Sequence, residues 1–167
     1  VALDVDLIIA TTDYLVSPTT YSTVLGSGTS VTLSDDQLSA ALPIGFSFEF
    51  YGNTYTDFFI SSNGYITFTG GFSNGCCSGQ LLPDPSDPNN LIAFAWEDLN
   101  PGAGGTIEYF VTGTSPNQAL VVNFFGVPHF GGGDIVNAQI VLYESSNQVV
   151  INLTDMPGLT GSHTLGL

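Results

Sequence analysis

The sequence predicts an all-β fold, an antiparallel two-sheet sandwich with jelly-roll-like character, and three observations support it. Apolar residues recur at every second position along several stretches, as in strands with one buried face. Clusters of Gly, Pro, Asn and Asp separate these stretches at regular intervals, as turns separate short antiparallel strands. No stretch shows the period of an amphipathic helix, and no internal repeat indicates a solenoid.

The alternating stretches give the strands in chain order. The clearest begins at Ile44, where four apolar residues alternate with small or polar ones as far as Phe50. The stretches that begin at Ile107 and Val136 repeat the pattern. We expect strands over Val5–Ile9, Ser30–Leu33, Ile44–Phe50, Phe58–Ser61, Tyr65–Phe68, Leu91–Trp96, Ile107–Val111, Leu120–Phe125, Val136–Leu142 and Val149–Leu153.

A tight hairpin is expected over Phe58–Phe68. Its centre reads Asn63-Gly64, the residue pair that favours the two positive φ angles of a type I′ turn. At the other end of the chain, His163–Leu167 still alternates where the sequence stops. We therefore expect one domain over residues 1–167, with residues 1–19 as a linker or first strand, forming part of a longer chain.

Composition and charge exclude several classes of protein. The 167 residues contain no Lys or Arg and fifteen Asp or Glu, for a formal net charge of −15. Nucleic acids and anionic membrane surfaces need cationic partners, and no apolar run is long enough to span a membrane. Charged residues make up only 9%, and Ser, Thr, Asn and Gly supply the polarity, as is typical of extracellular proteins. Each carboxylate must be solvated, hydrogen-bonded or bound to a metal.

Four sequence stretches carry a resemblance to a known family. Leu42–Tyr55, Ile60–Phe68, Cys76–Gln80 and Leu91–Leu99 resemble a domain of very large secreted surface proteins of gliding Bacteroidetes, and are distantly similar to the extracellular module of nidogens. The resemblance runs from about Thr20 to Leu167. It implies a non-catalytic adhesin or matrix module, exported by type IX secretion, that is often one of many along a giant chain.

The two cysteines, Cys76 and Cys77, are adjacent in a glycine-rich loop. They lack the spacing of a zinc or redox pair, and no Lys or Arg is present to favour a thiolate. An extracellular setting predicts that both are oxidised, in one linkage or to another chain. A bond between them would be strained, because neighbouring Cα atoms lie about 3.8 Å apart. Two interpretations remain, a structural stiffener of the loop and a rigid contact surface for a sugar or module.

The acidic segments suggest a cation site. Asp84, Asp87 and Asn89 fall within a Pro-rich turn, and Glu97 and Asp98 follow the next expected strand. Such oxygen ligands suit Ca²⁺, although the spacing is not that of an EF-hand. The alternative is a surface turn whose Asp and Asn side chains cap main-chain groups.

Catalytic patterns are weak, and we expect no enzyme activity. Glu97 or Asp98 with Glu49 or Glu108 forms only the kind of acid pair that arises by chance, and no nucleophile elbow or phosphate-binding loop is present. Trp96 is expected in the core; an exposed Trp96 would instead stack on a sugar, with His129 as a second ligand contact.

Two functions remain as expectations. The first is a non-catalytic structural or adhesive module of a bacterial extracellular surface protein or filament, whose partners are neighbouring modules, like subunits or surface glycans. The alternative is a Ca²⁺-dependent carbohydrate-binding domain. Both place the chain outside the cell, at the cell surface, without direct insertion into the membrane.

Overall fold

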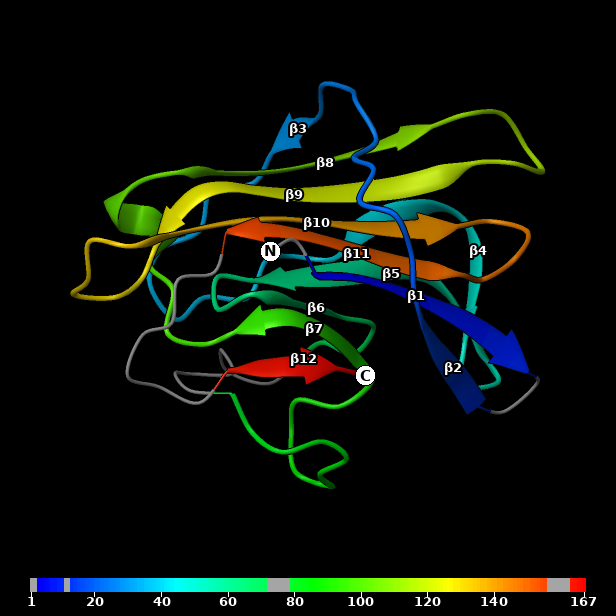
Figure 1. Ribbon diagram of the computed structural model, residues 1–167, viewed down its shortest axis with the longest axis horizontal. Coiled ribbons are helices and arrows are strands. Elements are labelled where there is room, and N and C mark those ends of the chain that lie inside the picture. The colour runs from blue at the N-terminus through cyan, green and yellow to red at the C-terminus, as the bar shows by residue number, and fades with distance from the viewer. Residues whose placement is uncertain (1–2, 11–12, 72–78, 156–162) are drawn as a thin grey trace.

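The computed structural model describes residues 3–10, 13–71, 79–155 and 163–167 and shows two antiparallel β-sheets (Figure 1). The strands are β1 (Leu3–Ala10), β2 (Asp13–Pro18), β3 (Thr29–Ser30), β4 (Leu42–Phe50), β5 (Asn53–Ser61), β6 (Tyr65–Thr67), β7 (Leu91–Trp96), β8 (Thr106–Thr112), β9 (Ala119–Pro128), β10 (Ile135–Tyr143), β11 (Val149–Asp155) and β12 (Thr164–Gly166). A short 3-10 helix, η1 (Pro101–Ala103), lies between β7 and β8. In the described stretches no helix is long and apolar enough to cross a membrane.

The order of the strands defines two layers. The seven-stranded sheet, called sheet A, has the order β2-β1-β11-β10-β9-β8-β3, and the five-stranded sheet B has the order β12-β7-β6-β5-β4. In the runs β4 to β7 and β8 to β11, each strand pairs with the next along the chain. The predicted two-sheet sandwich is confirmed: these two runs are meanders, β1, β2 and β3 complete sheet A, and β12 completes sheet B.

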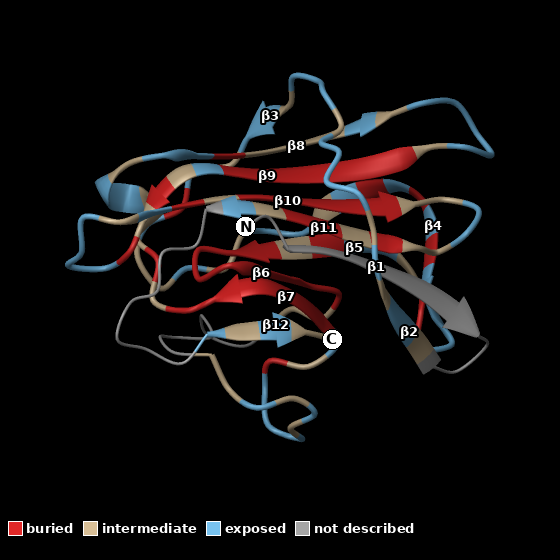
Figure 2. Ribbon diagram, in the orientation of Figure 1, coloured by how far each residue is buried: buried red, intermediate tan, exposed pale blue. Residues whose placement is uncertain are grey.

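The main core lies between the two sheets. In β4 the alternate residues Ile44, Phe46, Phe48 and Phe50 are buried, as the sequence pattern predicts. The Phe94 ring of β7 meets the Phe124 ring of β9 edge-on, with centroids 4.8 Å apart. This contact joins the sheets, and Figure 2 shows buried residues along β9, β10 and β5 to β7.

Strand β7 is buried on both faces, which alternation alone does not predict. All six of its residues are buried. On the side away from the main core, Trp96 and Tyr65 belong to a second apolar cluster, against which Leu38 and Leu82 pack. The main core therefore covers one face of β7, and segments outside sheet B cover the other.

The segment between β2 and β3, residues 19–28, crosses the outer face of sheet A and is called the strap (Figure 1). Gln139 binds the main chain of Val24 twice: Val24 N donates to Oε1 at 2.8 Å, and Nε2 donates to Val24 O at 3.0 Å. Asn152 binds Ser22 in the same way, at 3.3 and 3.1 Å. Two side-chain amides thus hold the strap in place of a backbone ladder.

The β5–β6 hairpin differs from the expected type I′ turn. Ser61 pairs with Tyr65, which leaves a three-residue loop, and within this loop only Gly64 has a positive φ, +77°. The prediction of two positive φ angles is therefore wrong. The reason is tertiary: the Asn63 side chain accepts a hydrogen bond from Leu99 N at 2.9 Å, so it serves distant residues rather than its own turn.

Candidate functional site

Strands β7 and β9 end close together, and the residues that follow them carry the polar groups of the candidate site. Leu99 forms an isolated antiparallel bridge with His129. On either side of it, Phe130 N donates to Asp98 O and Asn100 N donates to Pro128 O, each at 2.8 Å. Main-chain pairing therefore fixes the positions of Glu97, Asp98 and His129 relative to one another.

Glu97 lies between the two histidines of the chain. Its Oε1 makes a short hydrogen bond with His129 Nε2, and its Oε2 lies 2.9 Å from His163 Nδ1. Glu97 and His129 are 4% and 3% exposed, whereas the His163 side chain is 27% exposed. Because a buried carboxylate must be hydrogen-bonded and the chain has no Lys or Arg, the imidazoles supply the needed partners. We call these three side chains the Glu97–histidine group.

Asn63 connects the hairpin loop to this region. Its side chain is fully buried, and its Nδ2 donates to Asp36 Oδ1 at 2.8 Å while its Oδ1 accepts from Leu99 N. Its main-chain oxygen also accepts from Glu97 N at 3.2 Å. One asparagine therefore holds the segment after β7 against the turn that carries Asp36.

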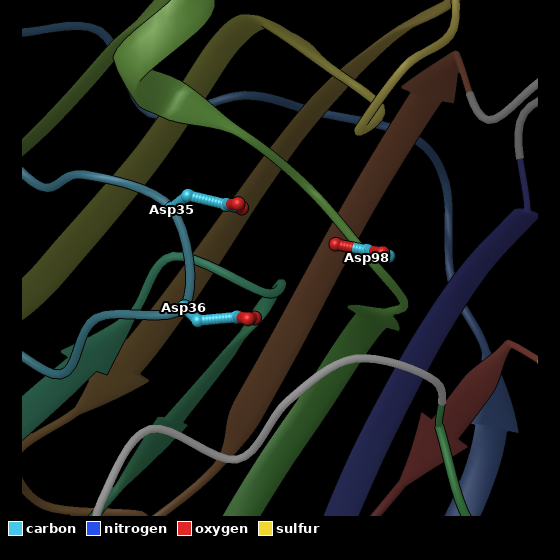
Figure 3. Close-up of side chains that lie close together, drawn as sticks. All are labelled: Asp35, Asp36 and Asp98. Carbon is cyan, nitrogen blue, oxygen red and sulfur yellow. The ribbon is translucent and has the colours of Figure 1, made fainter.

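Asp35, Asp36 and Asp98 form a carboxylate cluster, in which one oxygen of each lies within 4.8 Å of the others. Figure 3 shows Asp35 and Asp36 extending from one turn toward Asp98, which lies on the segment after β7. All three residues are partly buried. With no Lys or Arg in the chain, no ammonium or guanidinium group can neutralise them.

Two carboxyl groups of the cluster, those of Asp98 and Asp35, have a raised pKa. Burial raises the pKa of Asp98, the charges of Asp36, Asp35 and Glu97 raise it further, and His129 lowers it. Burial also raises the pKa of Asp35, with the charge of Asp36 as the second cause. Ionisation of Asp98 and Asp35 is therefore less favourable than in a solvated carboxyl group, and a bound cation would offset this cost.

The residues present fit a calcium ion. Asp35 Oδ1 is buried and has no hydrogen-bond partner among the described residues, so this oxygen is left for a ligand. Ca²⁺ accepts carboxylate, main-chain and water oxygens, about six to eight in all, without strict geometry. Three carboxylates would supply part of that shell, and water the remainder.

The predicted calcium ligands are divided among different environments. Asp98 joins the carboxylate cluster, whereas Glu97 is engaged by the histidines. Asp84 accepts two hydrogen bonds from Ser86, one from its main-chain N at 2.8 Å and one from its side-chain hydroxyl. Both lower the pKa of Asp84. Asp87 accepts from Asn89 Nδ2 at 3.1 Å. The Pro-rich turn thus fits the alternative interpretation, in which its Asp and Asn side chains form local hydrogen bonds within the turn rather than bind a cation.

Neither of the two proposed ligand contacts is accessible. Trp96 is 1% exposed and packs on Tyr65 with ring centroids 5.0 Å apart, which confirms its core interpretation. His129 is also buried, at 3% exposed. The prediction that either residue contacts a surface ligand is therefore wrong. Cys76 and Cys77 lie outside the described residues.

Sequence reasoning missed Asp35, Asp36 and Asn63. The one available signal was the adjacent Asp-Asp pair in a chain without cations, since such a pair needs compensation from elsewhere. Its proximity to Asp98 depends on contacts between segments far apart in sequence, which no local pattern records.

The two packed sheets make the chain a β-sandwich module. A family model described as "NIDO related" matches residues 13–167, and the chain belongs to this family. Searches of curated proteins and of solved structures gave no match. The family match supports the nidogen-like part of the resemblance and does not address its occurrence in gliding bacteria.

Proposed function

We propose that this chain is a non-catalytic structural and adhesive module of a bacterial extracellular surface protein or filament. The observation that carries the proposal is the NIDO-related match over nearly the whole chain, residues 13–167. The proposed setting is the surface of gliding Bacteroidetes, reached by type IX secretion. The proposed partners are neighbouring modules, like subunits and surface glycans.

The engagement of the Glu97–histidine group supports a non-catalytic role. Glu97 and His129 are buried, and both oxygens of Glu97 are hydrogen-bonded. A general acid or base must reach its substrate directly or through one water. This carboxylate is occupied in holding β-segments together, which is a structural use of residues that elsewhere serve catalysis.

Bead retention under flow tests the adhesive role. Beads that carry the purified domain should be retained on glass coated with the same domain or with a neutral polysaccharide, but not on blocked glass. Reducing ends released from the polysaccharide are counted in parallel and should not rise. Equal retention on all three surfaces would remove the adhesive proposal, and release of reducing ends would remove the non-catalytic one.

The carboxylate cluster favours a second candidate, the Ca²⁺-dependent carbohydrate-binding domain. Its specific support is the buried, unpartnered Asp35 Oδ1 beside two further carboxylates. We propose that Asp35, Asp36 and Asp98 bind the ion, in place of the ligand set expected from the sequence. A bound ion would tie the Asp35-Asp36 turn to the segment after β7.

Calcium is expected to raise the melting temperature of the wild-type domain. An ion that binds only the native state adds about 2.7 kcal/mol at a hundredfold excess over its dissociation constant. For a domain of this size that corresponds to roughly 5–10 °C. The measurement is a calorimetric scan in calcium and in chelator, and coincident curves would contradict the calcium proposal.

Asp98→Asn locates the ion. The pKa of Asp98 is raised in the native state, so ionised Asp98 destabilises the fold, and its effect grows as pH rises through that pKa. At neutral pH the variant should therefore melt no lower than wild type in chelator, and it should lose the calcium response. The control, Asp84→Asn, should keep that response. The reverse pattern would place the ion in the Pro-rich turn.

A further inference from the structure

We infer that a cleft beside the strap, on the outer face of sheet A, binds one neutral sugar ring. The inference rests on the adhesive function proposed above, and it adds a ligand class and a site. The cleft has a volume of about 200 Å³. The strap supplies Tyr21 and Thr23 to its wall, and strands β9 to β11 supply Asn123, Phe125, Asn137 and Thr154.

The floor of the cleft is a row of fixed amides. Asn123, Gln139 and Asn152 are 2%, 4% and 1% exposed. Gln139 Nε2 donates to Asn123 Oδ1 at 2.8 Å, and Asn123 Nδ2 donates to Glu108 Oε1 at 3.1 Å. Because these side chains are held by one another and by the strap, the floor is preorganised and a ligand need not order it.

Several groups at the rim remain for a ligand. Asn137 Oδ1 accepts from Gly126 N at 2.8 Å, whereas its Nδ2 makes no hydrogen bond within the described residues. The Thr154 hydroxyl donates to Asn137 O at 3.1 Å, which leaves its oxygen as an acceptor. The rim therefore offers both donors and an acceptor to a ligand that carries hydroxyl groups.

Two aromatic rings complete the rim. Phe125 is 48% exposed and Tyr21 is 39% exposed, although both rings are large and apolar. A sugar ring presents C–H groups on its face and hydroxyl groups on its edge. The exposed rings beside the Asn137 amide and the Thr154 hydroxyl match both features, because aromatic faces accept apolar contact while these two polar groups can donate and accept hydrogen bonds.

The uncharged lining of the cleft and the net charge of the protein indicate the class of ligand. No side chain that lines the cleft is charged, yet the protein as a whole carries a net charge of −15. An anionic ligand would be repelled by the field of the whole protein, and a cationic ligand would be drawn to the carboxylates elsewhere. A neutral ligand that forms hydrogen bonds fits best. The volume lies below the roughly 300–1,000 Å³ of sites for drug-sized ligands, which suits a single ring.

The test uses defined neutral oligosaccharides and two rim variants. The domain is titrated calorimetrically with maltohexaose, cellohexaose and N-acetylchitohexaose. We expect at least one to bind, and Phe125→Ala and Asn137→Asp each to weaken its affinity about tenfold or more. Asn137→Asp retains an oxygen to accept from Gly126 N and removes the two N–H donors. Both variants should keep the wild-type melting temperature within a few degrees.

Phe130→Ala is the matched control, because Phe130 is 55% exposed and does not line the cleft. It should bind like wild type. If a sugar binds and both rim variants retain wild-type affinity, the cleft is not the site, although the adhesive function stands. If none of the three sugars binds, the inference is wrong, and bead retention on domain-coated glass decides separately whether the adhesive function survives.

Discussion

Gly64→Ala is expected to destabilise the domain by about 4 kcal/mol and to lower its melting temperature by roughly 10 °C. Gly64 has φ +77°, and a Cβ built there would lie 2.2 Å from Ala95 O in β7. The main chains cannot separate easily, because Phe94 N and Ala95 N both donate to Gly64 O, at 3.2 and 3.1 Å. Thermal and denaturant unfolding measure the loss.

Gly52→Ala separates steric contact from backbone strain. Gly52 has nearly the same φ, +76°, but no atom of the described residues lies within 4 Å of a Cβ built there. This control should therefore lower the free energy of unfolding only through backbone strain, by about 1 kcal/mol. If Gly64→Ala is no more destabilising than Gly52→Ala, the close approach of the hairpin loop to β7 does not hold.

The strands were predictable because their signal is local. The alternation from Ile44 to Phe50 is a direct consequence of side chains pointing to opposite faces, and β7 was found with both of its ends, Leu91 and Trp96. Coverage of the outer faces was not predictable. The sequence pattern places Gln139 on the polar outer face of its strand. Nothing in the sequence shows that a strap crosses sheet A there and hydrogen-bonds to Gln139.

The site was only half predictable for a similar reason. The sequence assigned Glu97 and Asp98 to one calcium site because they are neighbours. Successive side chains of an extended segment point in opposite directions, so Glu97 meets the histidines while Asp98 meets the carboxylate cluster. The partners of each side chain are set by the β-sandwich, in which the turn between β3 and β4 and the end of β9 lie close to the segment after β7.

Glu97→Ala is expected to cost about 3 kcal/mol of unfolding free energy, the second large effect. The change removes both carboxylate hydrogen bonds and leaves His129 buried, and its Nδ1 already has no hydrogen-bond partner in the part of the chain that the structure describes. His163 directly precedes β12, so its release from Glu97 should also speed amide exchange in that strand. Unfolding by denaturant and hydrogen exchange measure the two effects.

Two controls define what the Glu97 result means. Removing any acid from a chain of net charge −15 relieves repulsion, so the exposed Glu49→Ala measures that gain alone and should be neutral or slightly stabilising. Glu97→Gln keeps the shape and an oxygen acceptor, and should lose less than Glu97→Ala. A Glu97→Ala domain as stable as Glu49→Ala, with unchanged exchange in β12, would show that the Glu97–histidine group holds nothing together. The expected loss would instead show that the two histidines take the place of the Lys and Arg that this chain lacks.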